Sequence, residues 1–313
     1  MTQKVLSYDL GGTKIAAGVV NRKGQILDEV SVPAEFSRGK KAVLNQIITL
    51  GQYFLSRHSE INHVGIASAG PLDPEKGILL SPTNFSTANK KWGKVPITEI
   101  LGRAFHKKVY LENDAAAAVL AEHWIGAGKR FKNVMVLTLG TGLGTGIICN
   151  DALVRAGRHL HPEAGHLILN YQDRSALCGC GNYGCAEAYL SGKHFARRAS
   201  LRLKRKNLSA REIADLARTG NPRALQAFDE YSTVMSVAIQ NYIRLYTPEI
   251  IVLTGSFAQT ADLFLKSTQA KLTQLLARQA DGLKWMPQIK VSTLQNEAGL
   301  IGGAYVAFLR SRA

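Results

Sequence analysis

The feature that most restricts the fold of this 313-residue chain is a pair of glycine-rich turns, one in each half of the sequence. The first turn is D-L-G-G-T at residues 9–13, after the apolar run from Val5 to Asp9. The second is L-G-T-G-L-G-T-G at residues 139–146, after the run from Val134 to Leu139. Where side chains are missing, backbone N–H groups can converge on phosphate oxygens, and threonine hydroxyls add donors. A single turn of this kind is most often only a tight hairpin. Two of them, each after a predicted buried strand, favour a pair of phosphate-binding hairpins.

Neither turn matches the common nucleotide-binding patterns. No G-x-x-x-x-G-K-[ST] segment occurs, and neither turn leads directly into a helix. Dinucleotide-dependent oxidoreductases and P-loop proteins are therefore disfavoured.

Hydrophobic periodicity predicts an α/β protein, and the length exceeds the usual size of one hydrophobic core, which favours two domains. In the first half we expect strands at 5–9, 15–20, 26–32, 64–69 and 108–112, helices at 41–57, 97–105 and 114–125, and a long loop over 71–95. In the second half we expect strands at 134–139, 146–149, 250–254 and 289–292, and helices at 193–206, 209–218, 221–246, 258–280 and 299–310.

The chain is strongly basic, with 39 Lys and Arg against 23 Asp and Glu. Such a charge attracts nucleic acid, anionic membranes or nucleotides, and does not choose among them. The densest basic stretch, residues 193–206, carries Phe195, Ala199 and Leu203 at helical spacing, so we interpret it as a solvated helix face. The sequence has neither 18 consecutive apolar residues nor a signal-peptide pattern, so we expect a cytoplasmic protein that does not bind membranes.

Three polar residues, Glu112, Asn113 and Asp114, stand where a predicted strand ends and a helix begins. This edge is the usual place for a ligand in an α/β protein. A carboxylate there could accept the proton of a hydroxyl that attacks a phosphoryl group. Asp114 could equally be a plain helix cap. Position alone leaves both alternatives open.

A metal site is predicted by the segment Cys178-x-Cys180-x4-Cys185, which follows His166 by twelve residues. Three thiolates and one imidazole suit tetrahedral structural zinc. Glycines between the cysteines supply the sharp turns that a metal-wrapping loop needs. The fourth cysteine, Cys149, lies among apolar neighbours, and we expect it in the core.

The motifs together resemble the ROK family, across nearly the whole chain and in family order. They are D-L-G-G-T-K at 9–14, E-N-D-A at 112–115, L-G-T-G-L-G-T-G at 139–146, E-A-G-H at 163–166 and C-G-C-G-N-Y-G-C-A-E at 178–187. The resemblance implies a two-lobed, actin-like and hexokinase-like (ribonuclease H-like) ATPase fold with a cleft. It also implies ATP, Mg²⁺ and a hexose, since most family members are sugar kinases. We expect a small lobe over 1–117, completed by a C-terminal helix at 298–313, and a large lobe with the zinc loop over 118–297.

The resemblance also implies roles for individual residues. The nucleotide-binding positions are Asp9 near the Mg²⁺, then Gly11, Gly12, Thr13, Lys14, Gly140, Thr141 and Gly142 at the phosphates, and Gly255 and Ser256 at the adenosine. The general base is Asp114, and the sugar-contacting positions are Asn84, Asn113, Asp114, Glu163, His166 and Glu187. The segment around Asn84 carries extra residues, so Asn89 is an alternative. Other departures are Thr145 in place of a third glycine, Ala116 in place of an asparagine, and Thr-Gly-Ser at 254–256 in place of an all-glycine loop.

The expected activity is phosphorylation of a hexose, with glucose favoured by W-G-K-V-P-I at 92–97 and the form of the cysteine motif. Other hexoses, such as fructose, mannose or an N-acetylhexosamine, are the alternatives. ROK repressors carry a helix-turn-helix segment before the first motif. Only eight residues precede Asp9, so we expect an enzyme without specific nucleic-acid binding. We further expect a homodimer, and a zinc site that orients the sugar pocket but leaves the distant phosphate-binding turns unaffected.

Overall fold

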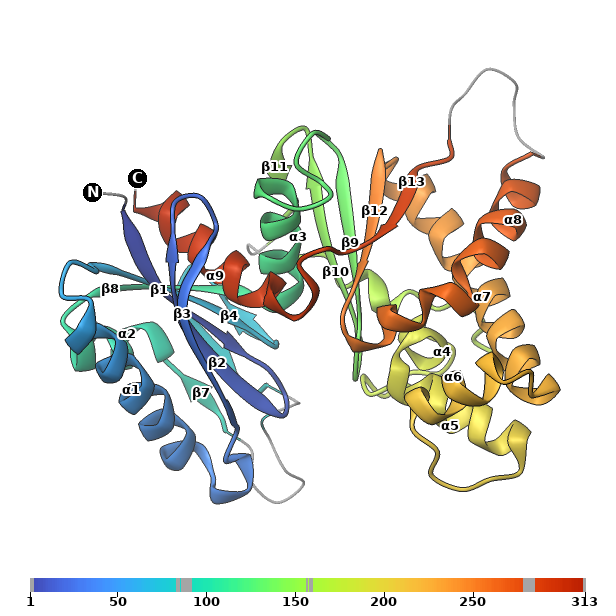
Figure 1. Ribbon diagram of the computed structural model, residues 1–313, viewed down its shortest axis with the longest axis horizontal. Coiled ribbons are helices and arrows are strands. Elements are labelled where there is room, and N and C mark those ends of the chain that lie inside the picture. Colours follow the sequence, from blue (N-terminus) through green and yellow to red (C-terminus); the bar gives the residue numbers. More distant parts are fainter. Residues whose placement is uncertain are drawn as a thin grey trace. The chain divides into compact units, whose positions relative to one another are not determined.

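The computed structural model describes residues 3–82, 85, 92–155, 157, 160–277 and 285–311, and forms two compact units (Figure 1). The first unit comprises Met1–Lys129, Leu153–Pro162 and Glu297–Ala313, and the second comprises Arg130–Ala152 and Glu163–Asn296. Each unit has its own five-stranded sheet, so the predicted α/β fold with two lobes is confirmed. The expected boundary at residue 117 falls inside a helix, α3 (Asp114–Trp124), that lies wholly in the first unit.

The first unit is built on a mixed sheet in the order β3-β2-β1-β4-β8. Its strands are β1 (Lys4–Leu10), β2 (Lys14–Asn21), β3 (Ile26–Pro33), β4 (His63–Ser68) and β8 (Lys108–Asn113). Strands β1, β2 and β3 form an antiparallel meander, whereas β4 and β8 continue the sheet in parallel with β1. Helices α1 (Lys40–Arg57) and α2 (Ile97–Phe105) pack on one side, and α3 and α9 (Ala298–Arg310) on the other.

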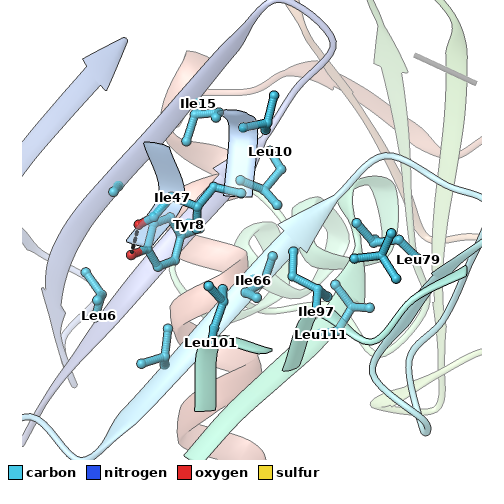
Figure 2. Close-up of a cluster of buried hydrophobic side chains, with 14 of the residues drawn as sticks. Leu6, Tyr8, Leu10, Ile15, Ile47, Ile66, Leu79, Ile97, Leu101 and Leu111 are labelled. Atoms are coloured by element: carbon cyan, nitrogen blue, oxygen red, sulfur yellow. Dashed lines mark hydrogen bonds between the residues drawn. The ribbon is translucent and has the colours of Figure 1, made fainter. Parts of the chain in front are cut away.

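Alternation along β1 supplies both faces of this sheet with apolar side chains. Leu6 and Tyr8 belong to the core shared with α1 and α2, which Figure 2 shows, and the Tyr8 hydroxyl donates to the carbonyl of Ile47 at 3.0 Å. Val5 points to the opposite face and packs with Ala304 and Phe308 of α9. Helix α9 lies very close to the sheet, because a Cβ added at Gly65 would come within 1.9 Å of the Gly303 carbonyl oxygen. Only glycine permits such an approach of two backbones.

The second unit repeats this arrangement with the order β11-β10-β9-β12-β13. Its strands are β9 (Val134–Leu139), β10 (Leu143–Cys149), β11 (Ala152–Leu153), β12 (Ile250–Thr254) and β13 (Gln288–Val291). Again the glycine turn joins the central strand to an antiparallel neighbour, and the next two strands run parallel. Its α-helices are α4 (Glu187–Leu190), α5 (Gly192–Leu203), α6 (Ala210–Arg218), α7 (Pro222–Tyr246) and α8 (Leu265–Leu276).

Three expected elements differ from the structure. The predicted helix over 258–280 is divided into a 3-10 helix, η4 (Ser256–Leu263), and α8, because the buried Phe264 leaves helical geometry with φ −131°. The expected loop over 71–95 contains a small sheet of β5 (Leu72–Asp73), β6 (Ile78–Leu80) and β7 (Lys94–Val95). Strand β10 begins at Leu143, three residues earlier than expected.

Candidate active site

Two acidic side chains come together in the first unit. Asp9 stands near the end of β1, and Asp114 is the first residue of α3. Burial and, to a smaller extent, the neighbouring Asp114 charge together raise the pKa of the Asp9 carboxyl to about 7, although Lys14 opposes the shift. The turn that joins β1 to β2, residues 11–14, is closed by an N–H of Gly11 that donates to the Lys14 carbonyl at 3.1 Å. A pair of carboxylates beside an open glycine turn provides oxygen ligands for a divalent cation.

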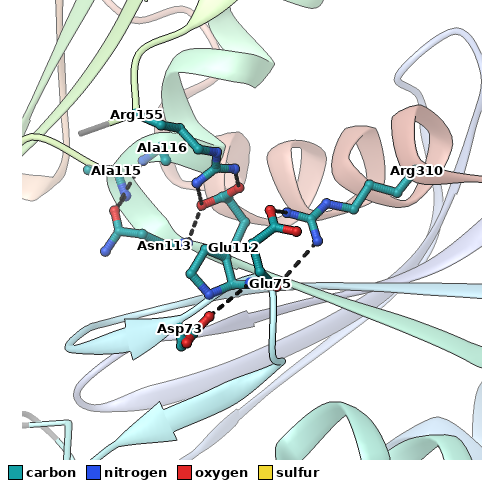
Figure 3. A network of polar contacts seen from close by, with 9 residues as sticks. Asp73, Glu75, Glu112, Asn113, Ala115, Ala116, Arg155 and Arg310 are labelled. Carbon is teal, nitrogen blue, oxygen red and sulfur yellow. Dashed lines mark hydrogen bonds and ion pairs between the residues drawn. The ribbon is translucent and has the colours of Figure 1, made fainter. Parts of the chain in front are cut away.

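The helix cap that Asp114 could have supplied is made by Asn113 instead. The Asn113 Oδ1 accepts from the backbone N–H groups of Ala115 at 2.8 Å and Ala116 at 3.1 Å (Figure 3). Its amide nitrogen remains available for a further acceptor. The Asp114 Oδ1 also accepts from the Ala115 N–H at 2.8 Å, but Asn113 already satisfies this N–H, so the Asp114 carboxylate is not required to begin the helix.

Glu112 has a structural role behind these residues. Its side chain is only 1% exposed, and it forms an ion pair with Arg155 while its Oε1 also accepts from the Asn113 N–H at 3.0 Å (Figure 3). Arg155 belongs to the segment Leu153–Pro162, which the chain contributes to the first unit. A buried carboxylate needs such a partner. The pair fixes the end of β8, where Asn113 and Asp114 follow.

A glycine that the sequence did not single out lies against Asp9. A Cβ added at Gly299, in the first turn of α9, would come within 2.6 Å of Asp9 Cγ and Oδ2. The missing side chain therefore leaves the space that the Asp9 carboxylate occupies. The only signal in the sequence is that Gly299 is the first residue of a predicted helix, far along the chain from Asp9.

Gly299→Ala should displace the Asp9 carboxylate, since a contact this short forces one of the two groups to move. We expect at least about a tenfold loss in kcat/KM for the magnesium nucleotide, because misplaced catalytic groups cost rate steeply. The matched control is Gly102→Ala in α2, where the added Cβ meets nothing closer than 3.4 Å. Steady-state kinetics of both variants checks this, and equal activity would contradict the assigned role of Gly299.

In the second unit the other glycine turn borders a cavity of about 680 Å³. Gly140, Thr141 and Ser256 line it together with α5 and α6 residues. Gly255 precedes Ser256 with φ 90°, and a Cβ there would lie 2.5 Å from the Leu139 carbonyl oxygen, so this position needs glycine. The cavity also includes Lys193, Arg211 and Arg218, which sequence reasoning missed as members of this site.

The E-A-G-H segment is held against β10 by buried contacts. The N–H of Ala164 donates to Thr145 Oγ1 at 3.1 Å, and the Tyr242 hydroxyl donates to the Ala164 carbonyl at 3.1 Å. A Cβ at Gly165 would lie 2.0 Å from the Leu143 carbonyl oxygen. Thr145, which departs from the family pattern, thus satisfies a buried N–H and positions the segment that carries Glu163 and His166.

The four predicted metal ligands His166, Cys178, Cys180 and Cys185 offer donor atoms that all lie within 4.8 Å of one another. Cys180 Sγ and Cys185 Sγ are 3.7 Å apart, and Cys178 Sγ is 3.4 Å from His166 Nδ1. A tetrahedral zinc site with Zn–S bonds of about 2.3 Å separates its ligand sulfurs by about 3.8 Å. Burial raises the pKa of the Cys178 and Cys185 thiols, so a bound cation would be needed to hold them as thiolates. The donor set fits zinc.

Glu187 connects this cluster to the glycine turn. Its Oε2 accepts from the Leu143 N–H at 3.0 Å, and its Oε1 accepts from the Cys178 thiol at 3.3 Å. A Cβ at Gly142 would lie only 2.6 Å from Glu187 Oε2. The expectation that the zinc site is distant from the phosphate-binding turns is therefore wrong for the turn at 140–142.

Within each unit, then, the structure groups the expected residues. Asp9, Lys14, Asn113 and Asp114 gather in the first unit, and His166, Glu187, the cysteines and the turn at 140–142 in the second. Asn84 and the alternative Asn89 lie outside the described residues. No helix in the described part of the chain is both long and apolar enough to cross a membrane.

The two five-stranded sheets, each with its glycine turn, define a two-lobed α/β fold of the hexokinase-like class. The sequence profile of the ROK family matches residues 5–309, and the chain belongs to this family. A glucokinase from Thermotoga maritima is 31% identical, over 97% of this chain and 96% of the relative. The ROK hexokinase structure from Thermus thermophilus superposes with a TM-score of 0.84 at 29% identity, covering 99% of both chains. A Streptomyces griseus ROK glucokinase in complex with glucose and AMPPNP gives 0.79 at 28% identity, covering 98% of this chain and 99% of that one.

Relatives with other names are also similar. An N-acetyl-D-glucosamine kinase from Haemophilus influenzae is 32% identical over 96% of this chain and 98% of the relative. A xylose repressor from Caldicellulosiruptor bescii is 26% identical over 95% of this chain and 76% of the relative. Family membership alone therefore does not select one sugar or one activity.

Proposed function

We propose that the protein is an ATP-dependent hexose kinase that converts glucose to glucose 6-phosphate. The observation that carries this proposal is the Asp114 carboxylate, which stands beside Asp9 at the start of α3, where Asn113 and not Asp114 is the N-cap residue. The cavity that joins Gly140 and Thr141 to Ser256 supports a nucleotide site in the second unit. Relatives named glucokinase, and the related structure with glucose and AMPPNP, favour glucose.

In the proposed reaction Asp114 accepts the proton of the sugar hydroxyl, whose oxygen attacks the γ-phosphorus while ADP leaves. Residues 11–14 and 140–142 bind the phosphates through backbone N–H groups, and Lys14 adds a positive charge. Asp9 would hold Mg²⁺, which neutralises the charge that develops on the phosphates. Gly255 and Ser256 would contact the adenosine.

The sugar would be bound by Asn84, Asn113, Glu163, His166 and Glu187. His166 directs its Nδ1 toward Cys178, which leaves Nε2 for a sugar hydroxyl when Nδ1 binds zinc. Asn113 uses Oδ1 for its cap and can donate from its amide nitrogen.

The test is a coupled assay of ADP release over glucose, mannose, fructose, N-acetylglucosamine and N-acetylmannosamine. We expect the highest kcat/KM with glucose. A clear preference for another hexose would replace the substrate but keep the reaction. ADP release with none of the five, together with sugar-dependent binding to a specific DNA site, would overturn the kinase proposal.

The raised pKa of Asp9, about 7, predicts a pH-dependent affinity for Mg²⁺. Below that pH the carboxyl is increasingly protonated and must release its proton to bind the cation, so the affinity should fall about tenfold per pH unit. Above it, the affinity should be nearly constant. Titration of the purified protein with Mn²⁺ as a spectroscopic substitute, between pH 5.5 and 8.5, measures the dependence.

Asp114→Asn is the matched variant for this titration. Removing the neighbouring charge should lower the pKa of Asp9 and shift the midpoint of the pH dependence to lower pH. The same midpoint in both proteins would show that the two carboxylates do not interact.

A further inference from the structure

A second cavity in the second unit, of about 750 Å³, is lined by four arginines: Arg174, Arg197, Arg198 and Arg202. Arg174 comes from the loop that carries the cysteine cluster, and the other three come from α5. Glu230 and Tyr231 of α7 close another side. Its volume lies within the range of small-molecule sites.

Two of the guanidinium groups, those of Arg197 and Arg198, contact one residue, Ser175. Arg197 Nη2 donates to the Ser175 carbonyl at 2.9 Å, Arg198 Nη1 is 3.4 Å from its hydroxyl, and Arg174 is its neighbour in sequence. Such a concentration of positive charge in a concave surface is costly without anions.

The carboxylates nearby neutralise only part of this charge. Arg202 pairs with Glu230, and Arg198 lies 3.5 Å from Asp173. Among the described residues Arg174 and Arg197 have no carboxylate within ion-pair distance; Arg174 stacks over the Tyr183 ring instead. The cavity therefore has two positive charges available for a ligand.

The rest of the lining is apolar and aromatic. Phe195 and Tyr231 are buried in an aromatic cluster, with ring centroids 5.6 Å apart, and Leu177 is exposed at the rim. A ligand that fits needs an anionic group and an uncharged body. A bare inorganic anion would leave the apolar part unfilled.

This cavity is separate from the one that contains the glycine turn, although α5 lines both. Gly192, Lys193 and Ala196 border the cavity with Gly140 and Ser256, whereas Arg197, Arg198 and Arg202 border the arginine-lined cavity. The basic stretch that the sequence suggested to be a solvated face therefore contributes Lys193 to one concave surface and three arginines of α5 to the other.

We propose that the arginine-lined cavity binds an organic phosphate monoester. Its dianion is held by Arg174 and Arg197 near Ser175, and its uncharged portion covers Leu177 and the aromatic floor. Arginine suits this ligand because its planar group donates two parallel hydrogen bonds to a phosphate. Binding is measured directly, so the inference does not depend on the proposed kinase reaction.

A second copy of this chain is the main competing occupant, since Leu201 at the rim is 75% exposed. A twofold interface apposes the same patch from both subunits. That would bring the unneutralised arginines of both copies together, which is unfavourable. A small anion reduces the repulsion among the arginines of the cavity, whereas a second copy would increase it.

Isothermal titration calorimetry tests the proposal, with glucose and AMPPNP at saturating concentration to occupy the proposed active site. The probes are AMP and glucose 6-phosphate, which present the same phosphate chemistry on a nucleoside and on a sugar, and inorganic phosphate for comparison. We expect one additional site per chain for at least one monoester, bound more tightly than inorganic phosphate. The monoester that binds more tightly shows whether the ligand is a nucleotide or a sugar phosphate.

The variants separate charge from folding. Arg174→Met combined with Arg197→Met should weaken binding by about tenfold or more, since each loses a charge-assisted hydrogen bond. Arg174→Lys with Arg197→Lys should retain part of the affinity. Arg205→Met removes the same charge just after α5, outside both cavities, and should bind as the wild type does.

Three results would overturn the proposal. They are no additional site for either monoester, equal affinity in the double methionine variant, and a wild-type dimer that the double methionine variant converts to monomer in sedimentation experiments. The last result would assign the cavity to a second copy.

Discussion

Asp114→Asn should lower kcat for sugar phosphorylation by about 10² to 10⁴ while the protein folds and binds sugar normally, because it loses the general base. The structure makes this substitution a clean test. The cap of α3 is supplied by Asn113, so the helix keeps its hydrogen bonds at 2.8 and 3.1 Å when Asp114 changes. Loss of a negative charge in the first turn costs stability of only about 0.3–1 kcal/mol.

The measurements are kcat from ADP release and sugar affinity from intrinsic fluorescence. Glu99→Gln in α2 is a matched control, since it removes an exposed carboxylate from the first turn of a helix elsewhere. A kcat in Asp114→Asn within about threefold of wild type would exclude a general-base role. If kcat falls and the variant also unfolds at a clearly lower temperature than the wild type, Asp114 maintains the fold instead.

The sheets could be predicted from the sequence because their signals are local. Continuous apolar runs such as 134–139 identify the central strands, and the glycine turns that follow identify the hairpins. The division of the helix after Ser256 could not be predicted. Neither glycine nor proline marks Phe264, and the break follows from the packing of its ring against Phe257 and Tyr231.

The candidate site shows the same contrast. Cysteine spacing predicted a cluster that the structure assembles, because the ligands lie within one short segment. The contacts of Glu112 with Arg155 and of Asp9 with Gly299 join residues far apart in sequence. They depend on how helices and loops pack, which no local pattern encodes. The Glu187 contact with Leu143, 44 residues away, was missed for the same reason.

The contact of Glu187 with Leu143 changes the expected effect of zinc removal on substrate binding. Chelation, or Cys180→Ser, should raise the KM for glucose roughly 10- to 100-fold, the range expected when support of a binding residue is lost. His166 and Glu187 both touch Cys178, so both lose their orientation. Glu187 also accepts from Leu143 N–H beside Gly142, so the KM for ATP should rise as well, by a smaller factor.

Cys149→Ser is the control for this experiment, because Cys149 lies on β10 away from the four ligands and should affect neither zinc content nor either KM. Metal analysis must show zinc in the wild type and its loss in Cys180→Ser, and thermal unfolding must show a folded variant, since loss of a structural metal can unfold a domain. A rise in the glucose KM with an unchanged ATP KM would mean that the turn at 140–142 keeps its shape without Glu187. Zinc-free protein with both KM values unchanged would show that the cluster does not support substrate binding, and that the contacts of Glu187 alone hold this part of the site.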